Sequence, residues 1–177
     1  LDNDFTLENI LDKFKYLVKT KGVKICVIDP FNKLEYRLGT GQTKLDYISQ
    51  VLDKIIWFAK VNDVLVHLVA HPRKLEKDKE GKFPMPTMYD IAGSADFWNK
   101  TDYGIAMSRK QDTNRVFINK GAISIQKVKF KNLGEQGLVD HCYNFRNGRF
   151  EEDFQPNDPI VNESSIWDNH NWITAKN

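Results

Sequence analysis

The chain lacks the features that mark membrane, secreted and disulfide-stabilised proteins. Its two cysteines, Cys26 and Cys142, are too few for a disulfide scaffold or a cysteine zinc site. The longest uninterrupted apolar runs span only a few residues, whereas a membrane-spanning helix needs about 20. No basic start precedes an apolar stretch of the secretory kind, so we expect no membrane partner and a cytoplasmic location. Cys26 lies inside an apolar run and is predicted to be a reduced core thiol.

A strong net charge is also lacking, because 26 Lys and Arg side chains stand against 24 Asp and Glu, a formal charge of +2. The balance is uneven along the chain. Residues 109–131 carry seven basic side chains against Asp112 alone, a balance of +6, and residues 132–177 carry a balance of −5. A concentrated basic segment in a nearly neutral protein indicates an anionic partner, and a solvated basic face is the alternative.

What is present is the pattern of one α/β domain. The 177 residues, 41% of them hydrophobic and 28% charged, suit a single soluble globular domain. Apolar spacing predicts helices over 6–20, 44–61 and about 90–99. Strands are predicted at 23–28, 64–70, 104–109, 115–118, 123–130 and 138–145, and a hairpin turn at 146–149. This order predicts a parallel sheet flanked by helices with an antiparallel C-terminal extension. We expect a domain over 1–154 and a loosely attached polar tail over 155–177.

The first two strands are almost continuously apolar, so we expect both to be buried on both faces. Each ends in a polar residue: Asp29 follows the first strand and His71 the second. In open α/β sheets, functional groups lie at the carboxyl ends of strands. There a carboxylate can hold Mg²⁺ through its waters, and a histidine can contact a terminal phosphate. The alternative is that both are turn residues before Pro30 and Pro72.

Three stretches carry a resemblance to a known family: KICVIDPFNKLEY, VLVHLVAHPRK and DIAGSADFWNKTDYGIAMSR. Together they resemble the RecA-like ATPase core of ring-shaped replicative DNA helicases of the DnaB-like group, which includes the phage and mitochondrial primase-helicase type. The resemblance spans about residues 1–150. Its most specific part runs from Asp90 through Gly93-Ser94 and Asp102 to Arg109.

The resemblance implies roles for several residues. Asp29 is similar to the Mg²⁺-associated acidic residue of the nucleotide site, and His71 to the residue that senses the γ-phosphate and links it to DNA. Arg109 is similar to the arginine that reaches the neighbouring subunit's ATP. Lys129 and Lys131 resemble a Lys-x-Arg pair that faces the same site. Here the second position is Lys, which keeps the charge and loses the planar fork of arginine.

The loop after His71, residues 72–89, is too long for a mere connection and is expected to be functional. The resemblance implies that it lines the central channel and contacts DNA through basic side chains, namely Arg73, Lys77 and Lys79. Apart from Phe83, no aromatic residue is interleaved with the basic residues of the loop, which favours contact with the DNA backbone over base stacking. The acidic side chains of the same loop keep a solvated loop as the alternative, namely Glu76, Asp78 and Glu80.

The motif that opens the family's ATP site, GxxxxGK[ST], does not occur in this sequence. Residues 39–44, GTGQTK, are superficially similar, but they follow no buried strand directly and have the wrong spacing. We therefore expect the C-terminal part of a helicase domain that does not hydrolyse ATP by itself. In the longer protein, the resemblance implies ATP and Mg²⁺ as cofactors, single-stranded DNA as partner and a hexameric ring of copies.

Two other readings stay open. The first is a RecA-like module without ATPase activity that only binds DNA or a partner. The second is an unrelated α/β domain in which Asp29 and His71 are only turn residues. The second reading predicts that the ends of strands 23–28 and 64–70 are not adjacent in space.

Overall fold

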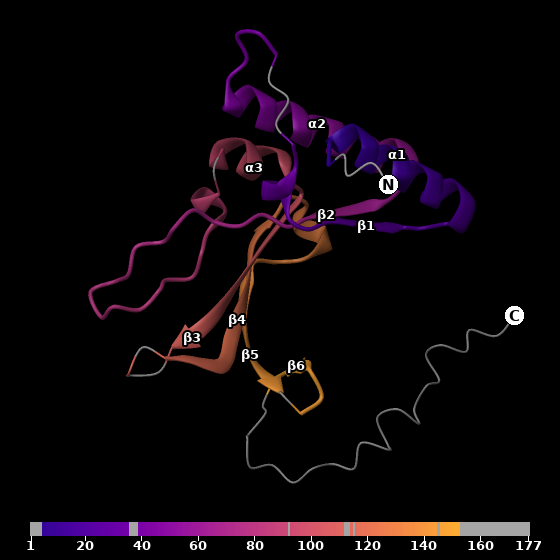
Figure 1. Cartoon of the computed structure of the whole chain (residues 1–177). Coiled ribbons are helices and arrows are strands. Elements are labelled where there is room, and N and C mark those ends of the chain that lie inside the picture. The colour runs from indigo at the N-terminus through magenta and orange to yellow at the C-terminus, as the bar shows by residue number, and fades with distance from the viewer. Residues whose placement is uncertain are drawn as a thin grey trace, which may run out of the picture.

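Helices precede a long antiparallel sheet in the computed structural model, which describes residues 5–35, 39–91, 93–111, 114, 116–144 and 146–152 (Figure 1). The helices are α1 (Leu7–Lys21), α2 (Lys44–Asn62) and α3 (Ser94–Lys100), with 3-10 turns at Phe31–Lys33, Met88–Asp90 and Lys131–Leu133. The strands are β1 (Ile25–Ile28), β2 (Leu65–Leu68), β3 (Tyr103–Gln111), β4 (Phe117–Val128), β5 (Gly137–Asn144) and β6 (Arg149–Glu151). The tail predicted over 155–177 lies outside the described residues. None of the described helices is long and apolar enough to cross a membrane.

Local end signals explain the first two helices, whose predicted ranges are confirmed. α1 ends at Gly22, whose φ of 68° is left-handed and suits a residue without a Cβ. α2 begins with a capping box, in which the Thr43 side chain accepts from the Asp46 amide and the Asp46 carboxylate accepts from the Thr43 amide. The third helix is shorter than predicted. Its N-cap, Gly93, has a φ of 81°, so the backbone turns there and helix begins only at Ser94.

The first two strands, β1 and β2, pair in parallel, as the α/β pattern predicts. Ile25 pairs with Leu65 and Ile28 with Leu68. The pairing continues beyond the strands, because the Val69 amide donates to the Ile28 carbonyl oxygen at 2.9 Å. The predicted fold class, a helix-flanked parallel pair followed by an antiparallel extension, is confirmed.

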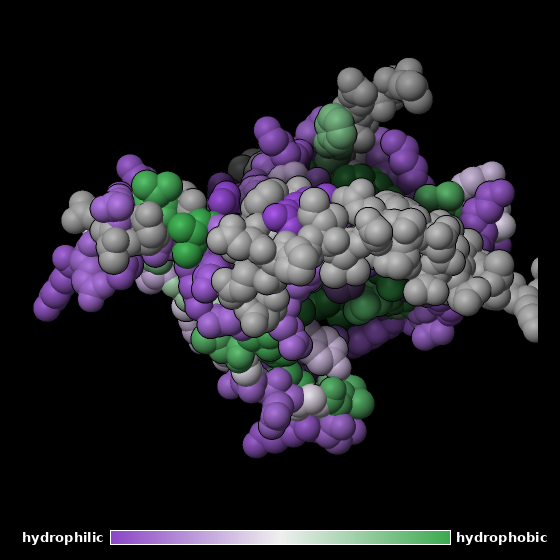
Figure 2. Space-filling model, turned by 90° about the horizontal axis from the view of Figure 1, so that it is seen from below, coloured by the Kyte–Doolittle hydropathy of each residue, from purple (hydrophilic) through white to green (hydrophobic). Residues whose placement is uncertain are grey.

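The prediction that the first two strands are buried on both faces is wrong, since Leu65 of β2 is 48% exposed and β1 is buried on one face alone. Cys26 and Ile28 are buried, whereas Ile25 is 59% exposed and Val27 52% exposed. α1 and α2 lie on one side of the β1–β2 pair (Figure 1), and no other described element covers the opposite face. Figure 2 shows apolar surface, in green, among the polar side chains on the side of the molecule seen from below. Burial is therefore set by the layers that cover a strand, which the strand's own residues do not encode.

The core lies between the three helices and β1. Its buried members are Leu7, Ile28, Phe31, Leu34, Ile48, Val51, Leu52, Ile55, Met88 and Phe97. Phe31 and Phe97 meet edge to face at 5.3 Å, which joins the turn after β1 to α3. Lys100 ties α3 to α2 through an ion pair with Asp53 at 2.7 Å. Cys26 is buried and free, as predicted, and its burial raises the pKa of its thiol.

The antiparallel sheet has the order β3-β4-β5-β6. Two separate strands were predicted over 115–118 and 123–130, but β4 runs unbroken through Gly121. A Cβ at Gly121 would lie 2.6 Å from Nε2 of His141, so this glycine lets a ring from β5 lie over β4. The predicted turn at 146–149 is present, with Gly148 at a φ of 71° before β6.

Candidate functional site

The ends of β1 and β2 bring Asp29 and His71 to the same edge of the parallel pair. Asp29 directly follows β1, and the Phe31 amide then donates to the Val69 carbonyl oxygen at 2.7 Å. The His71 amide donates to Oδ1 of Asn32 at 3.0 Å, so the two polar segments are joined by hydrogen bonds. The expectation of the unrelated-domain reading, that these ends lie apart, is wrong. Sequence reasoning missed Asn32, because its bond to the His71 amide joins residues 39 positions apart, which no local pattern indicates.

Both side chains at this edge are exposed and open to a ligand. No described group of three or more His, Cys, Asp or Glu residues could hold a metal ion. Mg²⁺ commonly keeps several waters and takes one or two carboxylates together with substrate phosphates. Asp29 therefore fits a Mg²⁺ that is held mainly by nucleotide and water, and does not fit a cage made by this chain alone.

The loop that follows His71 is closed at its base by Arg73 and Asp90. The Arg73 amide donates to the Asp90 carbonyl oxygen at 2.7 Å, and Nη2 of Arg73 lies 3.8 Å from Oδ1 of Asp90. The Asp90 carboxylate also accepts from the amide and hydroxyl of Thr87, both at 2.8 Å. These two hydrogen bonds, with a smaller contribution from Arg73, hold the pKa of Asp90 below its ordinary value.

The tip of the loop uses two of its acidic residues internally. Oδ1 of Asp78 accepts from the amides of Glu80, at 2.9 Å, and Lys82, at 2.8 Å. Glu80 in turn pairs with Lys82 at 2.9 Å. Two of the carboxylates that favoured a merely solvated loop are therefore engaged in forming the turn. Lys77 and Lys79 are exposed on the same loop, with no ion pair to another described residue.

Arg109 lies in β3, which continues to Gln111 and does not end at the arginine as predicted. It pairs with Gly121, which pairs in turn with His141, so the three form one row across the sheet. Nη2 of Arg109 donates to the Ile118 carbonyl oxygen at 3.3 Å, and its side chain is exposed. His141 is buried, and its Nδ1 has no hydrogen-bond partner among the described residues. Sequence reasoning missed His141, because strand alternation alone gives no sign that it lies in the same row of the sheet as Arg109.

The two candidate lysines lie at the other end of the same strand pair. The register sets Tyr103 opposite Val128 and Arg109 opposite Gly121. Lys129 is therefore roughly 20 Å from the position of Arg109 along the sheet, at about 3.4 Å per residue. Its Nζ lies 3.0 Å from Oδ1 of Asp102, and Lys131 is exposed in the turn that follows β4. The structure does not bring Lys129 and Lys131 together with Arg109 within one subunit.

Part of the basic segment 109–131 is neutralised within the chain. Lys110 pairs with Asp140 at 2.7 Å, in addition to the pair between Lys129 and Asp102. Nζ of Lys127 donates to the Trp98 carbonyl oxygen and lies 5.6 Å from the Trp98 ring centre. Partial burial, and then the neighbouring charge of Lys129, lower the pKa of Lys127. Part of the segment 109–131 therefore holds α3 against the antiparallel sheet.

The comparisons with known proteins fit this geometry. No family model matches the chain. Over 152 residues it is 34% identical to the Twinkle homolog protein, chloroplastic/mitochondrial, of Arabidopsis thaliana, which covers 86% of this chain and 21% of that protein. Its fold matches a DnaB-like replicative helicase whose structure was studied with its primase interactions, with a TM-score of 0.63, 20% identity, and coverage of 82% of this chain and 34% of that one. It also matches a second solved structure, an ATPase domain, with a TM-score of 0.66, 20% identity, and coverage of 84% and 52%.

The chain corresponds to part of the RecA-like core of the DnaB-like helicase family. It spans about a fifth of the length of the Arabidopsis relative. The start of α2 also argues against a phosphate loop at residues 39–44. The amide and hydroxyl of Thr43 both donate to the carboxylate of Asp46, so an anion from the chain itself already occupies this helix start. The same bonds lower the pKa of Asp46.

Proposed function

We propose that the chain supplies part of the ATPase core of a ring-forming replicative DNA helicase, which couples ATP hydrolysis to movement on single-stranded DNA and to duplex unwinding. The observation that carries the proposal is the parallel pairing of β1 and β2. It sets Asp29 and His71 at one sheet edge and places the closed loop 72–89 directly after His71. A nucleotide at that edge and a DNA strand at that loop would be separated by only a few residues of chain.

Asp29 would hold Mg²⁺ through its waters, and the ion would neutralise charge on the β- and γ-phosphates of ATP. His71 would contact the γ-phosphate from the neighbouring strand end. Because the His71 amide is fixed by Asn32, and Arg73 is fixed by Asp90, a shift of His71 would be passed to the base of the loop. Through these contacts, a change in the bound nucleotide would alter how the loop binds DNA.

Arg109 would act on the ATP of a neighbouring subunit in the ring. An arginine supplied in trans stabilises the charge of the transferring phosphoryl group and contributes about 10³–10⁵ in rate. Exposure of Arg109 on β3 supports a contact outside its own subunit. Lys131 is the better placed of the two lysines for a similar contact, since Lys129 would first have to leave Asp102.

Arg73, Lys77 and Lys79 would bind the DNA backbone. Phosphate contacts of this kind release counterions, so binding would be independent of sequence and would weaken as salt rises. The deciding experiment measures ATPase activity and single-stranded DNA binding of the full-length protein at two salt concentrations. We expect DNA-stimulated ATPase, salt-sensitive binding, and no hydrolysis by residues 1–177 alone.

DNA binding without any ATP hydrolysis by the full-length protein would overturn the helicase proposal and favour a RecA-like module that only binds DNA or a partner. The compartment is a separate point. A cytoplasmic location stays a prediction, and fractionation of the source cells would test it, with the organelle fraction as the contrary result.

A further inference from the structure

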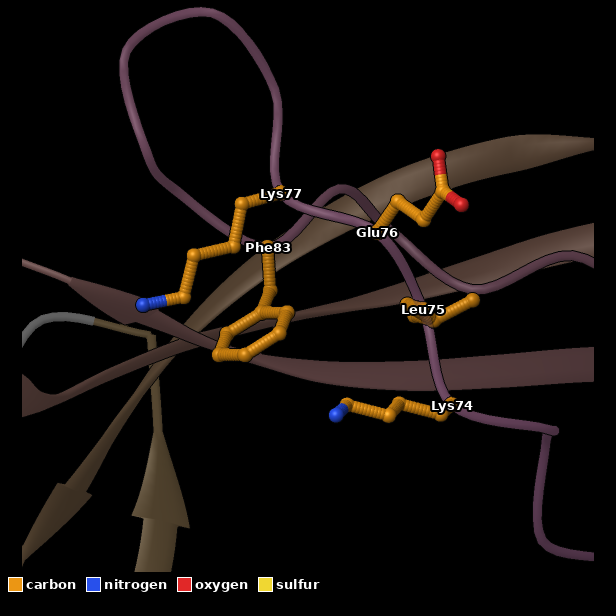
Figure 3. Close-up of a pocket in the computed structure, with 5 residues that line it drawn as sticks. All are labelled: Lys74, Leu75, Glu76, Lys77 and Phe83. Atoms are coloured by element: carbon orange, nitrogen blue, oxygen red, sulfur yellow. The ribbon is translucent and has the colours of Figure 1, made fainter.

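The loop 72–89, here called the DNA-contact loop after its proposed role, contains a hollow of about 440 Å³ that is lined by Lys74, Leu75, Glu76, Lys77 and Phe83 (Figure 3). The loop folds back on itself, because Asp78 and Lys82 are joined by a backbone hydrogen bond of 2.9 Å. This closure brings Phe83 next to Lys77, whose Nζ lies 5.1 Å from the centre of the ring. Residues that look unrelated in the sequence therefore form one surface.

The basic and acidic side chains around this hollow point to different sides of the loop. Figure 3 shows the Phe83 ring between the ammonium ends of Lys74 and Lys77, with both lysines extending to the same side of the loop as the ring. The Glu76 carboxylate points away from that side. Neither lysine has an ion pair with another described residue. The result is an aromatic face flanked by two positive charges, from which the Glu76 carboxylate is directed away.

The ring is both accessible and held in place. Phe83 is 40% exposed, and its amide donates to Oε1 of Gln111, at the end of β3, at 3.4 Å. The aromatic residue is therefore anchored to the antiparallel sheet while part of its side chain remains open to solvent. A ring on a supported backbone loses little freedom when a flat partner stacks on it.

We propose that the Phe83 ring stacks against one base of single-stranded DNA, while Lys74 and Lys77 bind the phosphates on either side of that base. This inference rests on the proposed function, which assigns the loop to DNA, and adds to it a base contact. Stacking accepts every base because each has a π face, so it strengthens binding without reading sequence. It also requires an unpaired strand, since the bases of a duplex stack on each other. Phe83 thereby distinguishes single-stranded from double-stranded DNA.

The test combines loss of the ring with loss of the base in the full-length protein. Affinity is measured for oligodeoxythymidine and for an abasic strand of equal length, which keeps the phosphates and lacks the bases. Stacking on an aromatic side chain is worth roughly 5- to 150-fold in affinity per base. We expect Phe83→Leu to weaken binding to the thymidine strand within that range and to leave binding to the abasic strand nearly unchanged.

Matched variants separate stacking from charge and from folding. Phe83→Tyr keeps a ring and is expected to bind both strands as the wild type does. Lys77→Gln is expected to weaken binding to both strands and to reduce the salt dependence by roughly 0.7 in slope, the value for one phosphate of a single strand. Phe83→Leu should leave the slope unchanged.

The outcomes distinguish the two proposals. Equal binding by Phe83→Leu and the wild type, with weaker binding by Lys77→Gln, would overturn the stacking contact and leave the DNA-contact loop standing. Equal loss on both strands by Phe83→Leu would also overturn stacking, because a structural defect does not depend on the bases. Unchanged binding by all three variants would overturn the assignment of the loop to DNA as well.

Discussion

Arg73 and Asp90 close the base of the loop that follows the second strand. Their backbones are joined by a hydrogen bond of 2.7 Å, and their side chains by a contact of 3.8 Å. His71 lies two residues before this closure and is itself fixed through Asn32. His71, the proposed phosphate sensor, and the proposed DNA-binding loop therefore belong to one short segment that these hydrogen bonds hold in place.

The contribution of Asp90 to the stability of the fold should decrease in acid. The two hydrogen bonds from Thr87 are the main reason why the pKa of Asp90 is lowered in the folded protein. The ionised carboxylate therefore stabilises the fold fully at pH values above the pKa of the unfolded chain, near 3.8. This stabilisation is lost as the pH falls through the lower pKa of the folded state. Thr87→Val removes the hydroxyl bond. We expect the pKa of Asp90 to rise in carboxyl NMR titrations, and the acid-dependent part of the unfolding free energy to shrink.

The matched control is Thr43→Val, which removes the equivalent hydroxyl from the Asp46 cap of α2. It should raise the pKa of Asp46 and leave that of Asp90 unchanged. An unchanged Asp90 pKa in Thr87→Val would contradict the role given to the hydroxyl.

Replacing His71 by alanine should uncouple ATP hydrolysis from DNA in the full-length protein. The side chain lies at the strand edge shared with Asp29, and only the His71 amide is needed for the bond to Asn32, so the local fold should persist. We expect ATPase activity measured with single-stranded DNA to fall toward the activity without it, and unwinding to be lost. The control is His67→Ala, since His67 is an exposed histidine within β2 itself. Unwinding at the wild-type rate in His71→Ala would refute the coupling role.

Arg109→Ala should abolish DNA-stimulated ATPase and leave nucleotide affinity within about 3-fold of the wild type. The reason is that an arginine supplied in trans stabilises the transition state of the neighbouring site, with an effect of about 10³ or more in rate. Lys110→Ala is the control, because Lys110 is adjacent but paired with Asp140. Parallel measurements of ATPase rate and of nucleotide binding decide the point, and an equal loss of both would count against action in trans.

How far the sequence predicts the molecule depends on the range of the interactions involved. The limits of α1 and α2 were predictable because their caps are local, as Gly22 and the Thr43–Asp46 box show. The exposed side of Ile25 and the unbroken course of β4 were not, because each depends on residues distant in the chain. The pairing of Lys129 with Asp102 likewise joins residues 27 positions apart, which no spacing rule gives.

The candidate site shows the same division. The adjacency of Asp29 and His71 was predictable because parallel strands end at a common edge. The contact between Phe83 and Lys77 depends instead on the turn that Asp78 forms, in which a side-chain oxygen takes the place of backbone partners. In the sequence Phe83 is the one aromatic residue between Arg73 and Met88, and only the folded loop places its ring between two lysines.

Gly93 is expected to be a stability determinant of the segment that carries the family resemblance. Its φ of 81° is unfavourable for residues with a Cβ, and a Cβ there would lie 2.9 Å from Cδ1 of the buried Ile48. Gly93→Ala therefore combines backbone strain of about 1–2 kcal/mol with overpacking of about 1–3 kcal/mol. Gly22→Ala isolates the first contribution, because Gly22 has a φ of 68° and nothing within 4 Å of an added Cβ. Urea unfolding of both variants should show the larger loss for Gly93→Ala, and equal losses would mean that Ile48 yields to the added methyl group at no cost.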